Sequence, residues 1–413
     1  MTPNSYKMKF LFIHQNFPAQ FKHLVPALVG AGHQVVALHH NACLPMPGVE
    51  FVRYAPQRGT SDKVHPWVSD WEAKVIRAEA VFHAALGLKS KGFTPDAVIA
   101  HPGWGESLFI KRVWPDTRLG IYAEFFYHAQ GADVGFDPEF ASEDVMSPCR
   151  IDLKNINNVA HLELADAAIS PTHWQASTFP KTFHPKITVM HDGIDCDALQ
   201  PNAQASVFIN QNLRLTRADE IITFVNRNLE PYRGYHIFMR ALPQLLKARP
   251  QARVIIVGGN KVSYGAPAPQ GQSWKDIFWN EVRSDLDTSR VHFVGKLPYK
   301  DYLQLLQVSK VHAYMTYPFV LSWSLLEAMS MGCAIVASDT APVREAIVHN
   351  QNGRLVPFFE PATLAREVAQ LCESATDRVR LGRAAREHAK THYDLKQRCL
   401  PAQLAWAQGL HAR

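Results

Sequence analysis

The sequence has no long hydrophobic run, no paired-cysteine motif and no large excess of charge of one sign. No stretch approaches the ~18 apolar residues of a transmembrane helix, and the apolar run 10–13 is too short for a signal peptide. The six cysteines lie far apart, without the spacing of a zinc site or a redox pair. They indicate reduced thiols in a cytoplasmic protein. The net charge of +6 is too small to indicate nucleic-acid binding.

The length and composition indicate a folded protein of two or three domains. The chain has 413 residues, and domains usually have roughly 100–200. Hydrophobic residues make up 47% and charged residues 19%, which excludes a disordered chain. We expect a cytoplasmic protein with at most peripheral contact with the inner face of an anionic membrane. That contact would use the basic residues of one predicted helix, Arg378, Arg380, Arg383, Arg386 and Lys390.

Strand-like and helix-like segments alternate along the chain, and the alternation starts twice. Short apolar runs such as 8–13, 34–38 and 96–100 are typical of buried parallel strands. The pattern weakens after 197 and resumes at 221–225. This predicts an α/β protein with two Rossmann-like, doubly wound domains and a ligand site at the carboxyl ends of the strands. The predicted parts are an N-terminal domain 1–197, a linker 198–217, a C-terminal domain 218–392 and a terminal segment 393–413.

Two arginines follow the first predicted strand of the second domain. Arg227 and Arg233 lie six residues apart in the segment 226–234. Guanidinium groups are suited to bidentate recognition of phosphate. Alternatively, both are solvated loop arginines that pair with Glu230 or Asp219.

A predicted helix start and a glutamate follow a later strand. Ser322 can cap a helix that begins at Trp323, and the free N–H groups of a helix start bind anions. Glu327 follows within the helix and can accept hydrogen bonds from the two hydroxyls of a ribose. Alternatively, this is a core helix whose glutamate pairs with an arginine. Two further strand ends would let a ligand approach the backbone closely, at Gly258 and at Lys296 with Leu297.

In this order, the segments resemble the C-terminal half of the family 4 retaining glycosyltransferases, which have the GT-B fold. The resemblance is strongest over 226–356, where 325–337 match the donor-site helix and strand of that family. Arg227 and Arg233 match its diphosphate-binding Arg and Lys. The resemblance implies two Rossmann-like domains that face a cleft, and a last helix, 393–413, that crosses back to the first domain.

The resemblance also implies a reaction. A hexosyltransferase-type enzyme would move a sugar, with retention of configuration, from a nucleoside-diphosphate sugar to a hydroxyl acceptor. Arg227, Arg233 and the N–H groups near Ser322 and Trp323 would neutralise the leaving diphosphate. The expected partners are a nucleotide sugar and a glycan or lipid-linked acceptor of cell-surface polysaccharide synthesis.

One departure from the family concerns the donor sugar. The family has a second glutamate eight positions before Glu327, and this chain has Phe319 there. Nucleotide binding should be retained, but the identity of the donor sugar does not carry over. Two alternatives remain, a nucleotide-sugar epimerase on the same fold and a non-catalytic nucleotide-sugar-binding subunit.

In the first half, the family tends to carry a histidine at the end of a strand that faces the cleft. By spacing, Glu124 occupies the position of that histidine, and His101 is a second candidate at the end of another strand. Either Glu124 assists as a base, or the departing phosphate itself takes the proton of the acceptor. Alternatively, His101 is a loop histidine that bonds to the backbone.

Neither a metal nor another cofactor is expected to be required. Two Asp-x-Asp pairs, at 195–197 and 285–287, have the spacing used by metal-dependent sugar transferases of a different fold. The first lies at the predicted hinge and the second in a predicted surface helix, so neither is placed to bridge a metal to a diphosphate.

Overall fold

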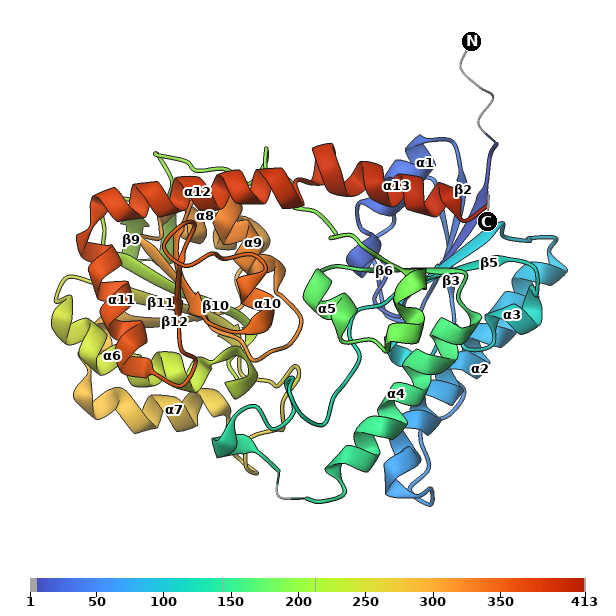
Figure 1. The fold of residues 1–413 in the computed structure, drawn as a ribbon, viewed down its shortest axis with the longest axis horizontal. Coiled ribbons are helices and arrows are strands. Elements are labelled where there is room, and N and C mark those ends of the chain that lie inside the picture. The colour runs from blue at the N-terminus through green and yellow to red at the C-terminus, as the bar shows by residue number, and fades with distance from the viewer. Residues whose placement is uncertain (1–5, 143, 212, 412–413) are drawn as a thin grey trace, which may run out of the picture. The chain divides into compact units, whose positions relative to one another are not determined.

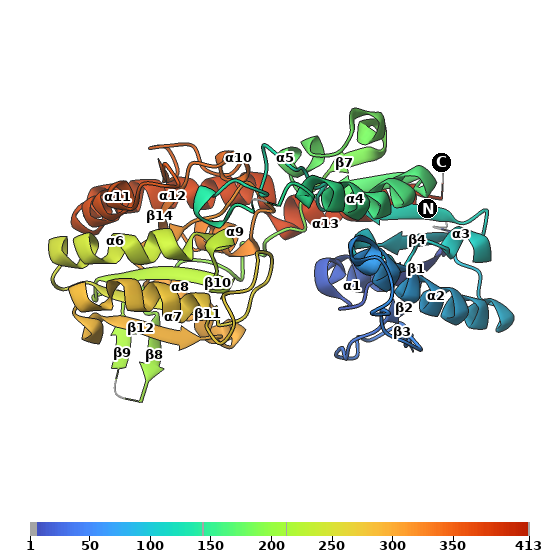
Figure 2. The ribbon, with the colours of Figure 1, turned by 90° about the horizontal axis from the view of Figure 1, so that it is seen from below.

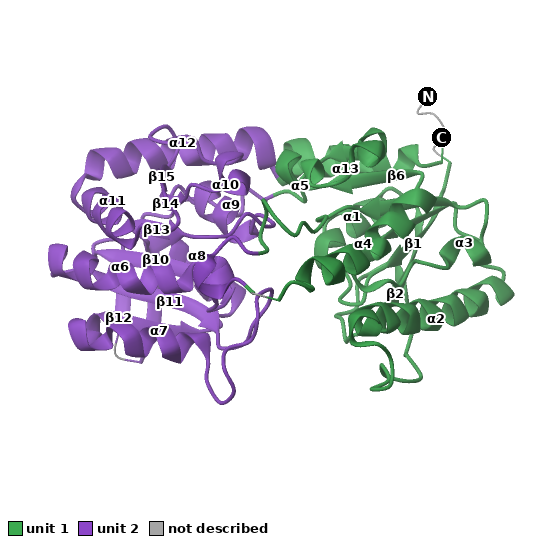
Figure 3. Ribbon diagram, turned by 60° about the horizontal axis from the view of Figure 1, so that its bottom comes forward, with its two compact units in different colours: residues 1–134, 142–193, 395–413 green, residues 135–141, 194–394 purple. Residues whose placement is uncertain are grey.

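The structure is a computed structural model that describes residues 6–142, 144–211 and 213–411 (Figure 1). The chain forms two compact units (Figure 3). Unit 1 comprises residues 1–134, 142–193 and 395–413, and unit 2 comprises 135–141 and 194–394. In the described part of the chain, no helix is both long and apolar enough to cross a membrane.

Unit 1 is built on a seven-stranded parallel sheet of order β3-β2-β1-β4-β5-β6-β7. Apolar side chains of β1 alternate between the two faces. Phe10 and Phe12 pack with the core around α1 and α13, and Leu11 and Ile13 pack with the core around α2 and α3. The strands are β1 (Lys9–Ile13), β2 (Gln34–His39), β3 (Val49–Arg53), β4 (Ala97–Ala100), β5 (Arg118–Tyr122), β6 (Ala167–Ser170) and β7 (Ile187–Val189). The helices are α1 (Leu24–Gly30), α2 (Ser69–Ser90), α3 (Ile110–Val113), α4 (Ser147–Leu164), α5 (His173–Ser177) and α13 (Leu400–Gly409).

Unit 2 is built on a six-stranded parallel sheet of order β12-β11-β10-β13-β14-β15. Its core covers both faces, with α6, α7 and α11 on one and α8, α9 and α12 on the other. The strands are β10 (Ile221–Asn228), β11 (Arg253–Gly259), β12 (Val291–Gly295), β13 (Val311–Tyr314), β14 (Ala334–Ser338) and β15 (Arg354–Val356). The helices are α6 (Tyr235–Ala248), α7 (Trp274–Val282), α8 (Tyr299–Val308), α9 (Trp323–Ser330), α10 (Ala341–Arg344), α11 (Pro361–Glu373) and α12 (Ala375–Tyr393).

The strand orders confirm the predicted fold class. Each sheet reverses its winding beside its first strand, between β1 and β4 in unit 1 and between β10 and β13 in unit 2. Such a reversal is the usual ligand site of a doubly wound sheet, at the carboxyl ends of the strands. Residues 198–217 carry an antiparallel hairpin, β8 (Ser206–Asn210) with β9 (Leu213–Thr216), whose strands lie outside the six-stranded sheet (Figure 2).

Helix α4 is a long helix that the sequence pattern does not predict. Its buried side chains are mostly polar, and they include Asn155, Asn157, Asn158 and His161. A helix with a polar buried face lacks the apolar spacing by which amphipathic helices are recognised.

The segment 135–141 lies far from the rest of unit 2 in sequence but belongs to it. The Asp137 carboxylate is buried, 2.9 Å from Nε2 of His236, and accepts a 2.8 Å hydrogen bond from the Tyr317 hydroxyl. Asp137, Glu139 and His236 are spaced as metal ligands could be. However, Arg240 donates to both carboxylate oxygens of Glu139, so the charge of Glu139 is already neutralised by an arginine.

Removing the Asp137 carboxylate should destabilise unit 2. Asp137→Ala leaves the buried Tyr317 hydroxyl and His236 ring without their anionic partner, so we expect a loss of about 3 kcal/mol in the free energy of unfolding. Urea unfolding of wild type and variant measures it. The exposed Asp285→Asn serves as a control and should stay within about 0.5 kcal/mol of wild type.

The pH dependence of this effect has a defined sign. Burial alone would raise the pKa of Asp137, but hydrogen bonds from His236 and Tyr317 lower it below its ordinary value. A lowered pKa in the folded state gives stability that is present above the unfolded pKa and is lost as the pH falls through the folded pKa. The stability advantage of wild type over Asp137→Asn should therefore shrink as the pH falls below about 4, the ordinary pKa of an aspartate. An advantage that grew as the pH fell below 4 would contradict this assignment.

Candidate functional site

A cavity of about 580 Å³ in unit 2 opens beside the carboxyl ends of β10 and β11. Its volume is in the range of small-ligand sites, roughly 300–1,000 Å³. Five elements contribute side chains to it, namely the ends of β10 and β11, the turn after β12, and the amino-terminal parts of α8 and α9. The lining residues are Val225, Asn226, Arg227, Val257, Lys296, Leu297, Tyr299, Tyr302, Ser322, Ser324 and Glu327.

Two cations and one carboxylate face this cavity. Arg227 and Lys296 are exposed, and within the described residues no carboxylate lies within 4.0 Å of either charged group. The alternative pairing of Arg227 with Glu230 or Asp219 is therefore not found. Because their charges are not neutralised by the protein, both side chains can bind an anion.

Glu327 is buried in the wall of the cavity. Its Oε1 accepts a 2.7 Å hydrogen bond from the Tyr299 hydroxyl, and its Oε2 accepts a 2.6 Å bond from the Tyr302 hydroxyl. Burial and the charge of Glu327 raise the pKa of both tyrosines, so both hydroxyls stay protonated and continue to donate. Each carboxylate oxygen keeps a further lone pair. Glu327 can therefore also accept the hydroxyls of a ligand.

Helix α9 begins at the cavity, and the predicted cap is confirmed. The Ser322 side chain accepts a hydrogen bond of 3.3 Å from the backbone N–H of Ser324, and helix α9 runs from Trp323 to Ser330. The two serine hydroxyls lie 2.9 Å apart, and both side chains line the cavity. The amino end of α9 thus adds partial positive charge to the wall that carries the two serines.

The structure does not place Arg233 on the surface of this cavity. Its guanidinium is buried and donates to Thr316 Oγ1 at 2.8 Å and to the Val320 carbonyl at 3.0 Å. The rings of Tyr264 and Phe319 lie 5.0 and 5.9 Å from it. Arg233 therefore holds the loop that leads from β13 into α9.

In this structure one of the two expected guanidinium groups lines the cavity and the other is buried away from its surface. Arg227 faces the cavity, and the second cation beside it is Lys296. The backbone explains why Arg233 turns inward, because Gly234 follows it with a φ of +64°. A Cβ at position 234 would lie 2.2 Å from the Met315 side chain, so the backbone of this turn packs directly against Met315.

Phe319 stands where the family has a glutamate, and it is part of the packing around Arg233. It is 4% exposed, and its ring centre lies 5.0 Å from that of Tyr264 and 5.5 Å from that of Tyr232. At this position the chain therefore has an aromatic side chain that supports the loop, in place of a carboxylate.

Two other predicted ligand contacts are not on the cavity surface. Gly258 packs under the turn after β10, because a Cβ there would meet the Leu229 side chain at 2.7 Å and the Asn226 carbonyl at 3.2 Å. Trp323 begins α9, but it is not among the lining residues, whereas Leu297 is.

In unit 1, the two predicted residues lie side by side. Their strands, β4 and β5, are parallel neighbours. His101 Nδ1 accepts the backbone N–H of Gly103 at 3.1 Å, and its Nε2 lies 3.4 Å from the Glu124 carboxylate. Gln20 also donates to Glu124, at 3.3 Å. His101 is thus bonded to the backbone, as in the alternative interpretation, and it also faces a carboxylate.

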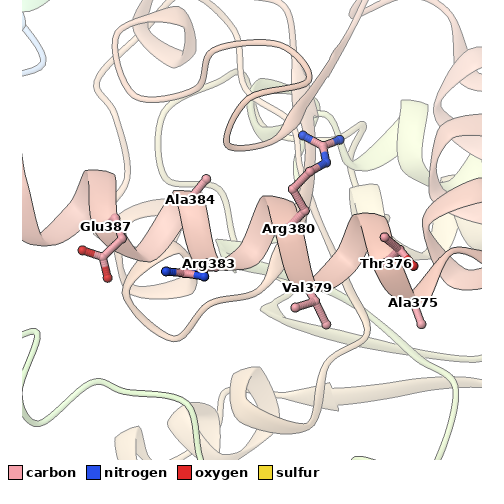
Figure 4. A pocket seen from close by; sticks show the side chains of 7 residues that line it. All are labelled: Ala375, Thr376, Val379, Arg380, Arg383, Ala384 and Glu387. Atoms are coloured by element: carbon pink, nitrogen blue, oxygen red, sulfur yellow. The ribbon is translucent and has the colours of Figure 1, made fainter.

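A further hollow lies along α12, where the membrane contact was expected (Figure 4). Arg383 and Glu387 line it together, so its charge is mixed. Three of the five basic side chains of α12 bond within unit 2: Arg378 to Leu371 and Cys372, Arg380 to Asn350 and Asp377, and Arg386 to Cys196, Leu199 and Ser330. This leaves Arg383 and Lys390 for any contact with anionic lipid.

Several lining residues were not foreseen. Tyr299 and Tyr302 lie three apart on an amphipathic helix, where aromatic residues usually indicate core packing. A recognisable signal was present only for Ser324, because it lies in the first turn of a predicted capped helix.

Comparisons with known proteins agree with this architecture. Residues 31–199 match the family model described as "Glycosyl transferase family 4 group", and residues 208–388 match "Glycosyl transferases group 1". The chain belongs to the group 1 glycosyltransferases. The chain is 26% identical over 209 residues to the D-inositol 3-phosphate glycosyltransferase of Corynebacterium efficiens, and the match covers 50% of the chain. It spans about half of that relative, 47% of its length.

Solved structures resemble the chain over nearly its whole length. Sucrose-phosphate synthase of Thermosynechococcus elongatus has a TM-score of 0.74 at 18% identity, over 98% of this chain and 100% of that one. HepE of Anabaena, in complex with UDP and glucose, has a TM-score of 0.65 at 18% identity, over 98% and 100%. At this level of identity the likeness establishes the fold, which is GT-B.

Proposed function

We propose that this glycosyltransferase moves a sugar from a nucleoside-diphosphate sugar, bound in the cavity of unit 2, to a hydroxyl group of its acceptor. The observation that carries the proposal is the charge pattern of the cavity. Arg227 and Lys296, free of carboxylate partners among the described residues, share a cavity with the buried carboxylate of Glu327. A nucleoside diphosphate combines an anion for the cations with vicinal hydroxyls for the carboxylate. HepE, which shares the fold, has been solved with UDP-glucose.

The residues of the cavity can perform the central task of glycosyl transfer. When the bond from the anomeric carbon to the diphosphate loosens, negative charge grows on the leaving phosphate. Arg227, Lys296 and the amino end of α9 stabilise that charge, which is the main source of catalysis in such a site. The sugar is transferred with retention of configuration, and the proton of the acceptor hydroxyl passes to the leaving phosphate or to Glu124.

The proposed acceptor is a glycan or lipid-linked hydroxyl compound of cell-surface polysaccharide synthesis. A second candidate function, a non-catalytic nucleotide-sugar-binding subunit, is favoured by Phe319, which replaces a carboxylate next to the donor site. Calorimetry with a panel of nucleoside diphosphates, followed by turnover assays with the corresponding sugar nucleotides, separates the two. Binding without turnover of any donor would support the second candidate, and failure to bind any nucleoside diphosphate would refute both.

Activity should persist in excess chelator. The fixed cations Arg227 and Lys296 supply the charge that Mg²⁺ or Mn²⁺ supplies in other transferases. Moreover, Asp195 and Asp287 each cap a turn, by accepting hydrogen bonds from the backbone N–H groups of Asp197 and Ser289. Initial rates in 5 mM EDTA, roughly a thousandfold above trace metal, should stay within about twofold of untreated enzyme. Loss of activity in EDTA that Mn²⁺ restores would show that a metal is needed.

A further inference from the structure

Unit 2 has a second cavity, which lies at the amino ends of its strands. Its volume is about 200 Å³, enough for one compact ligand. Four segments line it: the turn before β10, the end of α8 with the turn into β13, the turn from α9 into β14, and the first two turns of α12. The donor cavity opens at the carboxyl ends of the same sheet and shares no lining residue with this one. A ligand bound here is therefore not the sugar donor.

Three cations line this cavity together, each from a different segment. Arg217 precedes β10 and is exposed, whereas Lys310 before β13 and Arg378 on α12 are half-buried. Among the described residues, no carboxylate lies within 4.0 Å of any of these three charged groups. Burial and the charges of Arg378 and Arg217 lower the pKa of Lys310. Three like charges that converge without a counter-charge favour the binding of an anion.

The two acidic residues that follow Arg217, Asp219 and Glu220, bond to other groups. Both carboxylate oxygens of Glu220 accept hydrogen bonds from Arg249, at 2.9 and 2.6 Å. Asp219 Oδ2 accepts hydrogen bonds from the backbone N–H and the hydroxyl of Thr216, at 2.8 and 3.0 Å. Both carboxylates oppose the lowering of the Lys310 pKa, but neither forms an ion pair with that ammonium group. The positive charge of the cavity is therefore not neutralised by these neighbours.

Backbone carbonyls hold the three cations in place. Arg217 donates to the Gln307 carbonyl at 3.1 Å, and Lys310 donates to the Arg217 carbonyl. Arg378 donates to two carbonyls in the last turn of α11. These bonds could be the whole role of the three side chains, but a carbonyl carries no net charge to balance theirs. A guanidinium has five N–H groups and an ammonium has three, so each side chain keeps donors for a ligand and is already oriented.

We propose that this cavity binds a phosphate monoester, whose phosphate group lies between Arg217, Lys310 and Arg378. The three cations match the two charges of a monoester better than the single charge of a carboxylate. Ala375, the first residue of α12, also lines the cavity, so the amino end of this helix adds partial positive charge. The recognised group is the phosphate, which a soluble ester and a lipid headgroup have in common.

The organic part of the ester has space beside the phosphate. The hollow along α12 shares Ala375 and Val379 with this cavity (Figure 4). Val379 is 71% exposed and offers an apolar contact there. An ester that reaches from the three cations into the hollow therefore gains contacts that inorganic phosphate lacks.

The first test measures phosphate binding by calorimetry. Inorganic phosphate is titrated into an Arg227→Ala, Lys296→Ala protein, which lacks the cations of the donor cavity, so the result does not depend on the proposed function. We expect saturable binding. Adding Arg217→Gln or Lys310→Met should raise the Kd at least about tenfold, because each removes a charge-assisted interaction.

Matched controls show whether the effect belongs to this cavity. Arg214→Gln on β9 and Lys247→Met on α6 remove exposed cations that do not line it, so both should leave the phosphate Kd unchanged. Arg217→Gln decides the test, because this side chain is exposed and its only backbone bond is to Gln307. An unchanged Kd in Arg217→Gln, or no saturable phosphate binding without it, would overturn the proposal.

The second test identifies the source of the phosphate. In the same protein, glycerol 3-phosphate should bind at least as tightly as inorganic phosphate, and glycerate, its carboxylate counterpart, about tenfold more weakly. Sedimentation with phosphatidylcholine vesicles, with and without phosphatidic acid, tests the lipid. Binding to phosphatidic acid that Arg217→Gln abolishes would assign the phosphate to a lipid headgroup, and binding of glycerol 3-phosphate alone would assign it to a soluble ester. Glycerate that binds as tightly as glycerol 3-phosphate, or an ester that binds more weakly than inorganic phosphate, would refute a monoester site.

Discussion

Arg227→Ala should lower kcat by roughly 10²–10³, the range for removing one donor that stabilises charge in the transition state. Arg227 is the exposed cation at the end of β10, and within the described part of the chain no carboxylate neutralises it. Its interaction with the leaving phosphate strengthens as the glycosidic bond breaks, so the loss should fall on kcat more than on KM. Steady-state kinetics with the donor found by the nucleotide panel measure it.

Two further variants sharpen this prediction. Arg227→Lys keeps the charge but not the bidentate geometry, so it should recover part of the rate. Arg283→Ala removes an exposed arginine of unit 2 away from the cavity and should behave as wild type. If Arg227→Ala keeps more than a third of wild-type kcat, Arg227 does not stabilise the leaving group.

Arg233→Ala is expected to act differently, because Arg233 is a positioning residue. Without its bonds to Thr316 and Val320, the loop before α9 loses its support. Both donor affinity and thermal stability should therefore fall together, whereas Arg227→Ala should leave stability unchanged. A stable Arg233→Ala protein that loses only kcat would show instead that Arg233 stabilises the leaving diphosphate.

The comparison of these two arginines shows what the sequence can and cannot predict. Both follow the same strand, and parallel topology alone places Arg227 at the ligand edge of the sheet. Which way Arg233 points depends on a 3₁₀ turn and on the close approach of Gly234 to Met315, neither of which spacing reveals. The capped start of α9 was predictable because a cap is a local signal.

The same distinction applies to unit 1. His101 and Glu124 could be placed together because each follows one of two adjacent strands. The contact of Asn157 with the Pro102 carbonyl could not be predicted, because Asn157 lies on α4, whose buried face is polar and gives no helical pattern. The docking of the segment at Asp137 in unit 2 depends on side chains about 100 and 180 residues away, as its contacts with His236 and Tyr317 show. Such contacts are invisible to local sequence patterns.

Glu327→Ala should weaken the binding of a ribonucleoside diphosphate by about 10–100-fold and leave the fold intact. Among the described residues, Glu327 is the only acidic residue that lines the cavity, and each of its carboxylate oxygens can still accept one hydroxyl of a ribose. Hydrogen bonds to a charged group contribute about 1.5–3 kcal/mol, which sets the expected range. Truncation also frees the hydroxyls of Tyr299 and Tyr302, so affinity alone does not separate a direct contact from a local rearrangement.

A comparison of UDP with 2′-deoxy-UDP makes that separation. Wild type should prefer UDP, because only the ribose presents two adjacent hydroxyls to Glu327. In Glu327→Ala the two ligands should bind with equal affinity. The four dissociation constants, measured by calorimetry, form a double-mutant cycle. The coupling energy between the 2′-hydroxyl and the Glu327 carboxylate should be at least about 1 kcal/mol. Tyr302→Phe keeps the carboxylate and loses only one of its supports, so it should retain the preference for UDP even if its overall affinity falls. If Glu327→Ala still discriminates between the two ligands as wild type does, the ribose lies elsewhere, and the carboxylate serves only to hold the two tyrosines against α9.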